Sequence, residues 1–273
     1  MYVDYHNHTV LCHHATGTVD EYLERAAEME IDEFGFAEHS YWMIRPDGRN
    51  LCPSRSEMDT YLEWMEDKRL IYDGKHGNPM LRVGLEADWV PDRVGEAMRF
   101  IDSYPFDYVL GSVHHLVDPS TDRYVCTWWF DSDDVDEVYR RYFEAVGELA
   151  KSGMCDILAH LDVIRRCGRL PKRGLLPYFE EILPAIVESG VAVEINASGL
   201  DHTGRDFFPR HDILKLLVES GVPITFGSDG HAVEHVGRYM MDVKKYLADA
   251  GGTEFVRFER RKKLPTNLTI GMD

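Results

Sequence analysis

Two histidines, His6 and His8, lie one residue apart in the stretch from Asp4 to Thr9, directly after a short β-like segment. Residues two apart in a strand point to the same face, so the two imidazoles would be presented side by side. Imidazole is a common ligand of transition metals, and such a pair suits one ion. Two surface histidines near a terminus would have the same spacing. The pair therefore predicts a metal site only if other parts of the chain supply further ligands.

Similar side chains recur where six further apolar or β-branched runs end. The motifs are GFAEHS with His39, VGLEAD with Glu86, GSVHH with His114 and His115, DILAHLD with His160, VEINASG with Glu194 and Asn196, and FGSDGH with Asp229 and His231. A single histidine at such a place is most often an ordinary polar residue. However, parallel α/β folds gather their active sites at the carboxyl ends of the strands. The recurrence therefore indicates a shared metal site.

The apolar runs alternate with helical patterns, which predicts a parallel sheet with right-handed crossovers. The predicted strands are Tyr2–Asp4, Phe34–Ala37, Leu81–Leu85, Tyr108–Ser112, Ile157–Ala159, Val191–Ile195 and Ile224–Phe226. A capping-box pattern, Thr18 with Glu21, begins the first helix. Further helices are predicted over Glu57–Tyr72, Arg93–Ser103, Val135–Ser152, Leu176–Ser189, Asp212–Ser220 and Glu234–Ala250. Seven such units without an obvious linker favour one α/β domain, residues 1–273, and a barrel over an open sheet.

Composition excludes several classes of function. The 273 residues carry a formal net charge of −18, which disfavours binding to nucleic acid or anionic membranes. An anionic substrate would need concentrated positive charge, for which metal ions are the strongest source. Neither a signal peptide nor a membrane-spanning run is visible. The five scattered cysteines are typical of reduced thiols, so we expect a cytoplasmic enzyme. The sequence predicts no oligomeric state.

The ordered set of motifs resembles the polymerase-and-histidinol-phosphatase (PHP) family of metal-dependent phosphoesterases. The matching stretches are HNH, AEHS, GLEAD, GSVHH, LAHLD, EINASGL and GSDGH, which run from Asp4 to about Gly237. The histidinol-phosphatase branch is the most similar. The resemblance implies a distorted seven-stranded (β/α) TIM-like barrel that holds three divalent ions. It also implies hydrolysis of a phosphate monoester, with L-histidinol phosphate as the expected substrate in histidine biosynthesis.

The resemblance also implies which residues bind each ion. One ion would use His6, His8 and Asp229; a second would use His114 and His160, with Glu86 as the bridge between the two; a third would use His14, His39 and His231. Among these residues Glu86, Asp229 and His231 are the expected catalytic ones. Mixed imidazole and carboxylate ligands suit Zn²⁺, Mn²⁺ or Fe²⁺ better than Ca²⁺ or Mg²⁺. Two such ions can share a hydroxide as the nucleophile.

One ligand is ambiguous, because His13 and His14 are adjacent. The family's spacing from His6 favours His14. Cys12 beside them is able to bind zinc, although a buried inert thiol is the commoner case.

Positively charged side chains are expected to hold the phosphate. Arg165 and Arg166 follow His160 closely, and a guanidinium matches phosphate geometry, although both could equally belong to a solvated basic face. In similar sequences a basic residue follows SGL, whereas here Asp201 and His202 come first. Arg205 or His202 is then the candidate for that role. The aromatic stretch Tyr124–Phe130 would wall the substrate pocket or pack under the next helix.

Four alternatives remain open from the sequence. The same cluster could hydrolyse another small ester, such as a nucleotide or sugar phosphate. An amidohydrolase would share the first motif but usually needs a lysine as the metal bridge. A proofreading exonuclease is disfavoured by the negative charge, and a non-catalytic metal-binding module by the completeness of the motif set.

Overall fold

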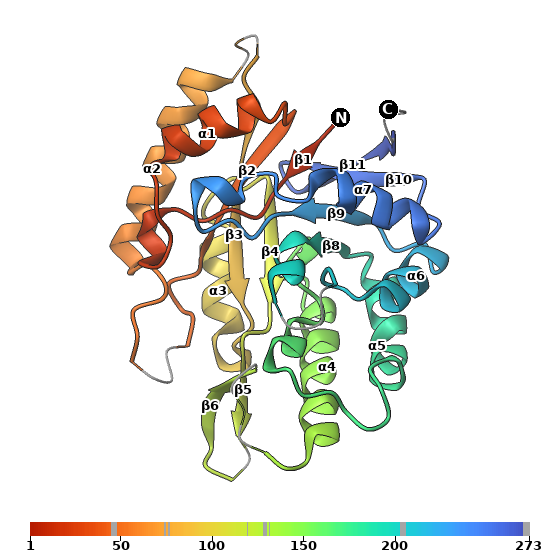
Figure 1. The fold of residues 1–273 in the computed structure, drawn as a ribbon. Helices are drawn as coiled ribbons and strands as arrows, with labels where there is room; N and C mark the ends of the chain where they lie inside the picture. Colours follow the sequence, from red (N-terminus) through yellow and green to blue (C-terminus); the bar gives the residue numbers. More distant parts are fainter. Residues whose placement is uncertain are drawn as a thin grey trace.

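A parallel sheet of seven strands curls into a barrel in the computed structural model, which describes residues 1–44, 48–73, 75, 77–118, 120–127, 130, 132–202 and 206–269 (Figure 1). In order across the sheet, the strands are β1 (Val3–Asp4), β2 (Glu33–His39), β3 (Met80–Asp88), β4 (Tyr108–Ser112), β7 (Ile157–Leu158), β8 (Ala192–Asn196) and β9 (Ile224–Gly227). All neighbouring pairs are parallel.

The two outer strands, β1 and β9, meet and nearly close the barrel. The backbone N–H of Tyr5 donates to the carbonyl of Phe226 at 3.1 Å, and Asn7 forms a parallel bridge with Gly230. The barrel that the sequence predicts is therefore confirmed. Because all seven strands run the same way, their carboxyl ends gather at one end of the barrel.

Helices follow most of the strands and lie around the outside of the sheet (Figure 1). They are α1 (Val19–Glu28), α2 (Arg55–Tyr72), α3 (Val94–Ile101), α4 (Val135–Lys151), α5 (Leu176–Ser189), α6 (His211–Glu219) and α7 (Met240–Asp249). The predicted capping box of α1 is present, since the Thr18 side chain accepts from the N–H of Glu21 and the Glu21 carboxylate accepts from the N–H of Thr18. Short 3-10 turns are η1 (Val10–Cys12), η2 (Pro91–Arg93), η3 (Val163–Cys167), η4 (Ala197–Asp201) and η5 (Val233–His235).

The prediction of a helix from Glu234 to Ala250 is wrong at its start. The turn η5 comes first, and α7 begins only at Met240. Gly237 and Tyr239 have positive φ angles, 64° and 56°, which break the helical path between the two elements. His235 consequently lies in a turn at the barrel mouth.

Two antiparallel hairpins were not predicted. The first pairs β5 (His115–Asp118) with β6 (Arg123–Cys126), and the second pairs β10 (Glu254–Glu259) with β11 (Lys262–Asn267). The second hairpin packs on the barrel: Phe258 is fully buried, and Arg257 forms an ion pair with Glu33 of β2. Of the aromatic stretch Tyr124–Phe130, Tyr124 belongs to β6, while Trp128 and Trp129 lie outside the described residues.

The buried apolar residues form a single cluster that fills the barrel and the space under its helices. Tyr108 is typical: its hydroxyl donates to the carbonyls of Tyr5 and Phe36, at 2.5 and 3.2 Å, and ties three strands together. All five cysteines are described, and none forms a disulfide. No helix in the described part of the chain is both long and apolar enough to cross a bilayer.

Candidate metal centre

The nine predicted metal ligands all lie at the carboxyl end of the barrel. His39 is the last residue of β2 and Glu86 lies near the end of β3, whereas the others are in the segments that follow β1, β4, β7 and β9. Most of them line one cavity of about 1170 Å³. The lining includes His14, His39, Glu86, His114, His160, Asp229 and His231. His6 and His8 are fully buried beneath it.

Two glycines let the segment after β9 approach β1 and β8 closely. A Cβ atom on Gly227 would stand 1.9 Å from Oε1 of Glu194, and one on Gly230 would stand 2.2 Å from Oδ1 of Asn7. Since only glycine fits at either position, these residues allow Asp229 to reach the two histidines that follow β1.

The first group is formed by His6, His8 and Asp229. The Nε2 atoms of His6 and His8 lie 3.8 and 3.6 Å from Oδ1 of Asp229, and 3.6 and 3.7 Å from Oε2 of Glu86. Two ligands of one Zn²⁺ ion, each about 2.0–2.1 Å from it, lie roughly 3.3 Å apart in tetrahedral geometry. The observed spacings are close to that value. These atoms are therefore arranged around a point where an ion fits.

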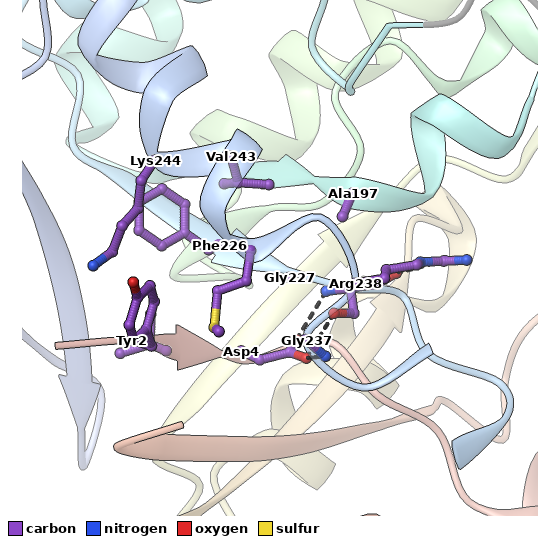
Figure 2. A pocket seen from close by; sticks show the side chains of 12 residues that line it. Tyr2, Asp4, Ala197, Phe226, Gly227, Gly237, Arg238, Val243 and Lys244 are labelled. Atoms are coloured by element: carbon purple, nitrogen blue, oxygen red, sulfur yellow. Dashed lines mark hydrogen bonds between the residues drawn. The ribbon is translucent and has the colours of Figure 1, made fainter. Parts of the chain in front are cut away.

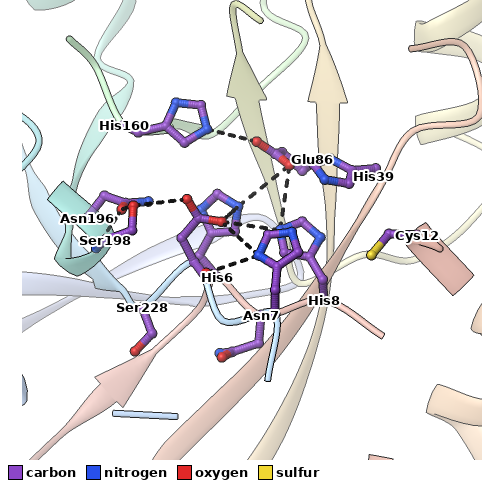
Figure 3. A network of polar contacts seen from close by, with 12 residues as sticks. His6, Asn7, His8, Cys12, His39, Glu86, His160, Asn196, Ser198 and Ser228 are labelled. Carbon is purple, nitrogen blue, oxygen red and sulfur yellow. Dashed lines mark hydrogen bonds and ion pairs between the residues drawn. The ribbon is translucent and has the colours of Figure 1, made fainter. Parts of the chain in front are cut away.

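Glu86 connects this group to a second one (Figure 3). Its Oε1 lies 3.0 Å from Nε2 of His160 and 3.3 Å from Nε2 of His114, and the two imidazole nitrogens are 3.3 Å apart. Oε1 thus faces His114 and His160, while Oε2 faces His6 and His8 and also lies 2.6 Å from Nδ1 of His39. That is the arrangement a bridging carboxylate requires.

In the third group, the expected His14, His39 and His231 lie together with two further donors, Cys12 and His8. The ring of His231 stacks on His8, with centroids 4.2 Å apart, and lies 4.6 Å from the ring of His14. Ligand atoms within 4.8 Å of one another belong to His8, His39 and His231, or to Cys12, His14 and His231. His14 and His39 have ring centroids 5.3 Å apart. The expected residues are neighbours, but Cys12 and His8 offer donors to the same space.

The structure separates the adjacent histidines His13 and His14. The His14 ring turns toward the cluster, and its Nδ1 lies 2.8 Å from the carbonyl oxygen of Cys12, which leaves Nε2 available as a ligand. The His13 ring instead lies beside Glu57, with Nε2 3.4 Å from Oε1. His14 is therefore the residue in position to bind an ion.

Several buried polar atoms of the cluster have no hydrogen-bond partner within the described structure. They are Nε2 of His6, both ring nitrogens of His8, Nδ1 of His160 and Nε2 of His231. An unsatisfied buried polar group is costly, so a concentration of them demands an explanation. Cations held between these atoms would satisfy them. The donor set thus fits a metal centre of imidazole and carboxylate ligands.

Two further carboxylates, Glu194 and Asp88, orient imidazoles, and a third, Glu38, lies near His8; of the three, only Glu194 was named from the sequence, as a strand-end carboxylate. Glu194 Oε1 lies 2.8 Å from Nδ1 of His6, Asp88 Oδ1 lies 3.0 Å from Nδ1 of His114, and Glu38 Oε1 lies 3.6 Å from Nδ1 of His8. All three are buried. Such partners fix the tautomer and the direction of a ligand. Each is found in the same strand-end motifs, VEIN, GLEAD and AEHS, which was the signal available.

The charges of the cluster are strongly coupled. Burial alone would raise the pKa of Glu86, but His39, His114 and His6 outweigh it and hold that pKa well below its usual range. Burial would lower the pKa of His114, yet Glu86 and Asp88 raise it to about 10. Burial dominates at His39 and lowers its pKa to about 4. The carboxylates therefore attract positive charge, which protons or divalent cations can supply.

The two adjacent arginines have different surroundings. Arg165 is buried, and its Nε and Nη2 donate to the carboxylate of Asp162 at 2.6 and 3.3 Å, while Nη2 also donates to the carbonyl of Phe207. It does not line the cavity, so the expectation that it anchors phosphate is not supported by its position. Arg166 does line the cavity. Burial lowers the pKa of Arg166, and Asp229 partly offsets that effect.

The remaining candidates lie on the mouth of the cavity or outside the described residues. His202 lines the cavity together with Tyr124 of β6, the residue of the aromatic stretch that forms part of the wall. Arg205 lies outside the described residues.

Known proteins resemble this chain over most of its length. The profile of the PHP domain matches residues 4–198. A probable histidinol-phosphatase of Deinococcus radiodurans is 30% identical over 262 residues, covering 96% of this chain and 98% of that protein. The histidinol-phosphatase of Bacillus subtilis is 25% identical over 264 residues, covering 86% and 95%.

Among solved structures, the histidinol phosphate phosphatase of Lactococcus lactis, complexed with zinc, L-histidinol and phosphate, has the same fold. Its TM-score is 0.77 at 22% identity, and the match covers 96% of this chain and 98% of that one. The putative histidinol phosphatase of Listeria monocytogenes matches with a TM-score of 0.76 at 20% identity, over 87% and 98%. With its profile match over most of the chain and its barrel of strand-end ligands, this protein belongs to the PHP domain family.

Proposed function

We propose that this protein is a metal-dependent phosphoric monoester hydrolase that converts L-histidinol phosphate to L-histidinol and phosphate, in the cytoplasm and as a step of histidine biosynthesis. The observation that carries the proposal is Glu86, a buried carboxylate at the base of a large cavity, whose Oε1 faces His114 and His160 while its Oε2 faces His6, His8 and His39. The relatives that match nearly the whole chain carry the name of this activity.

We propose three ion sites in the cluster. His6, His8 and Asp229 would hold one ion and His114 with His160 another, and Glu86 would bridge them. His14, His39 and His231 would hold the third, with Cys12 as an additional donor within reach. When bound, such divalent ions of zinc, manganese or iron offset phosphate charge and activate water for attack at neutral pH.

The protein's own side chains have separate tasks in this scheme. Glu194 and Asp88 hold His6 and His114 through their Nδ1 atoms, so that each Nε2 points toward Glu86. Arg166 would bind phosphate oxygens from the cavity wall, since a guanidinium offers several N–H donors in a plane that matches them. His202 and Tyr124, on the same cavity, would contact the organic part of the ester.

The experiment is phosphate release from a panel of monoesters by protein loaded with Zn²⁺ or Mn²⁺. If the proposal holds, kcat/KM for L-histidinol phosphate exceeds that for nucleotide and sugar monophosphates by far more than tenfold, a difference above about 1.4 kcal/mol in transition-state binding. A flat profile across the panel would favour the alternative of a less selective phosphatase with the same metal centre.

A further inference from the structure

The loop between β9 and α7 carries two of the proposed ligands in a backbone conformation that must be held in place. Asp229 has a φ angle of 54°, in the left-handed region that residues other than glycine rarely adopt. His231 follows two residues later, and its Nδ1 lies 3.1 Å from the carbonyl oxygen of Asp229. The position of that carbonyl therefore sets the direction of both ligand side chains.

Asp4 of β1 forms hydrogen bonds with residues near both ends of the loop. Its side chain is buried, with 3% exposed. Oδ1 accepts from the N–H of Ser228 at 2.8 Å, while Oδ2 accepts from the Ser228 hydroxyl at 2.7 Å and from the N–H of Gly237 at 3.0 Å. Figure 2 shows Asp4 and Gly237 joined in this way across a small pocket. One carboxylate thus ties the beginning and the end of the loop to the first strand.

Arg238, near the end of the same loop, binds the carbonyl groups at its beginning. Its Nε and Nη2 donate to the carbonyl of Ser228 at 2.8 and 2.5 Å, and Nη2 also donates to the carbonyl of Asp229 at 3.0 Å. The remaining nitrogen, Nη1, donates to Asp201 Oδ2 at 2.6 Å. A planar guanidinium can satisfy these acceptors together, whereas an ammonium group offers one point of contact.

We infer that Asp4 and Arg238 are positioning residues that fix Asp229 and His231 in the geometry needed to bind ions. Neither residue makes a hydrogen bond to a proposed metal-binding atom: Asp4 acts through Ser228 and Gly237, and Arg238 acts through the backbone carbonyl of Asp229, which also orients His231. This inference rests on the proposed metal-dependent function of the same site.

The contact with Asp201 separates two roles for Arg238. Asp201 also accepts from the Tyr239 hydroxyl at 2.7 Å, and both residues are exposed and line the cavity over the cluster, as Arg238 does. If Arg238 acted only through Asp201, loss of the hydrogen bond from Tyr239 to Asp201 would have the same effect as replacement of the Arg238 guanidinium. Tyr239→Phe removes the hydroxyl that donates to Asp201 and leaves the contacts of Arg238 with the carbonyls of Ser228 and Asp229 in place, so it distinguishes these possibilities.

The test is zinc affinity, measured by competition with a chromophoric chelator on the full-length protein. Arg238→Lys should weaken binding of at least one zinc ion about 10- to 100-fold, the usual loss when a residue that supports a metal ligand is replaced. Asp4→Asn should act in the same direction, which keeps the inference testable if one variant does not fold. Tyr239→Phe should stay within about twofold of wild type, as should Arg140→Lys, a matched substitution on the exposed face of α4.

Hydrolysis provides a second readout, because a positioning role predicts that excess zinc restores turnover of Arg238→Lys, whereas general damage to the fold would not respond. Wild-type zinc affinity in both Arg238→Lys and Asp4→Asn would overturn the inference. Equal weakening in Tyr239→Phe and Arg238→Lys would also overturn it, because the effect would then come through Asp201. If wild type itself bound no zinc, the proposed function would fail together with the inference.

Discussion

At the scale of single residues, Glu86 is the centre of the proposed chemistry. Its carboxylate is 1% exposed and is surrounded by the nitrogens of five histidines. We expect Glu86→Gln to keep the fold but to lower metal content and turnover together, because a neutral amide is a poor bridging ligand. Metal analysis beside steady-state kinetics tests this. A variant that stays fully loaded and fully active would mean that Glu86 is not the bridge.

Arg165 and Arg166 should differ in what their removal damages. Arg166→Ala should lower kcat/KM roughly tenfold to a hundredfold, about 1.5–3 kcal/mol for a charge-assisted contact, with unchanged metal content. Arg165→Ala should instead lower the free energy of unfolding by about 3–5 kcal/mol, since it leaves the buried carboxylate of Asp162 without its ion-pair partner. Kinetics and denaturant titration on both variants separate the two roles. The reverse pattern would make Arg165 the anchor.

The raised pKa of His114 has a consequence for metal binding. With a pKa of about 10 the imidazole carries a proton at pH 7, and this proton must leave before Nε2 can bind an ion. Loading metal-free protein should therefore release protons, and affinity should rise from pH 6.5 toward pH 9. The stability of the metal-free protein should change in the opposite direction with pH. The stabilisation that charged His114 provides is complete below about pH 6.5 and is lost as the pH rises through 10. Calorimetry in buffers of different ionisation enthalpy measures the release, and pH-independent affinity would contradict it.

At the scale of elements, the sequence predicted the strands and helices that follow a recurring local pattern. Each strand is a short apolar run followed by a helix, so the seven barrel strands and most helices follow from local patterns. The β10–β11 hairpin lacks such a pattern. Its turn places Arg260 and Arg261 at positive φ, 48° and 62°, where asparagine or glycine would normally signal a turn. Contacts with Asp107 and Asp156, distant in sequence, hold that turn.

In the site, too, local patterns predicted the ligand positions but not the contacts between segments that are distant in sequence. The predicted ligands lie in strand-end motifs, so their convergence follows from the parallel topology. Whether Arg165 or Arg166 faces the cavity depends on Asp162 and on the carbonyl of Phe207, a contact between segments that local sequence does not reveal.

The C-terminal hairpin should stabilise the barrel without taking part in the chemistry. Phe258→Ala removes a fully buried ring that packs on Tyr5, with centroids 6.2 Å apart, and should cost about 3–5 kcal/mol of unfolding free energy. Lys262→Ala, at an exposed position in β11, should cost almost nothing. Denaturant titration compares them, with metal content as the control. Equal stability of the two variants would show that the hairpin is not part of the core.

At the scale of the whole molecule, a negatively charged protein has to bind a negatively charged substrate. A chain with a formal charge of −18 repels a phosphate ester over most of its surface. Among the described residues, the cavity over the cluster brings together Arg166, His202 and the proposed ligands. Bound divalent ions would make this the place where an anionic substrate is attracted. The account therefore requires metal for substrate binding as well as for catalysis.

Elemental analysis of the purified protein, with hydrolysis of L-histidinol phosphate measured before and after a strong chelator, tests this central claim most directly. The account predicts tightly held zinc, manganese or iron, loss of activity on chelation, and recovery when one of these metals is returned. Protein that contains none of the three metals and hydrolyses the substrate equally well in the presence of the chelator would contradict it.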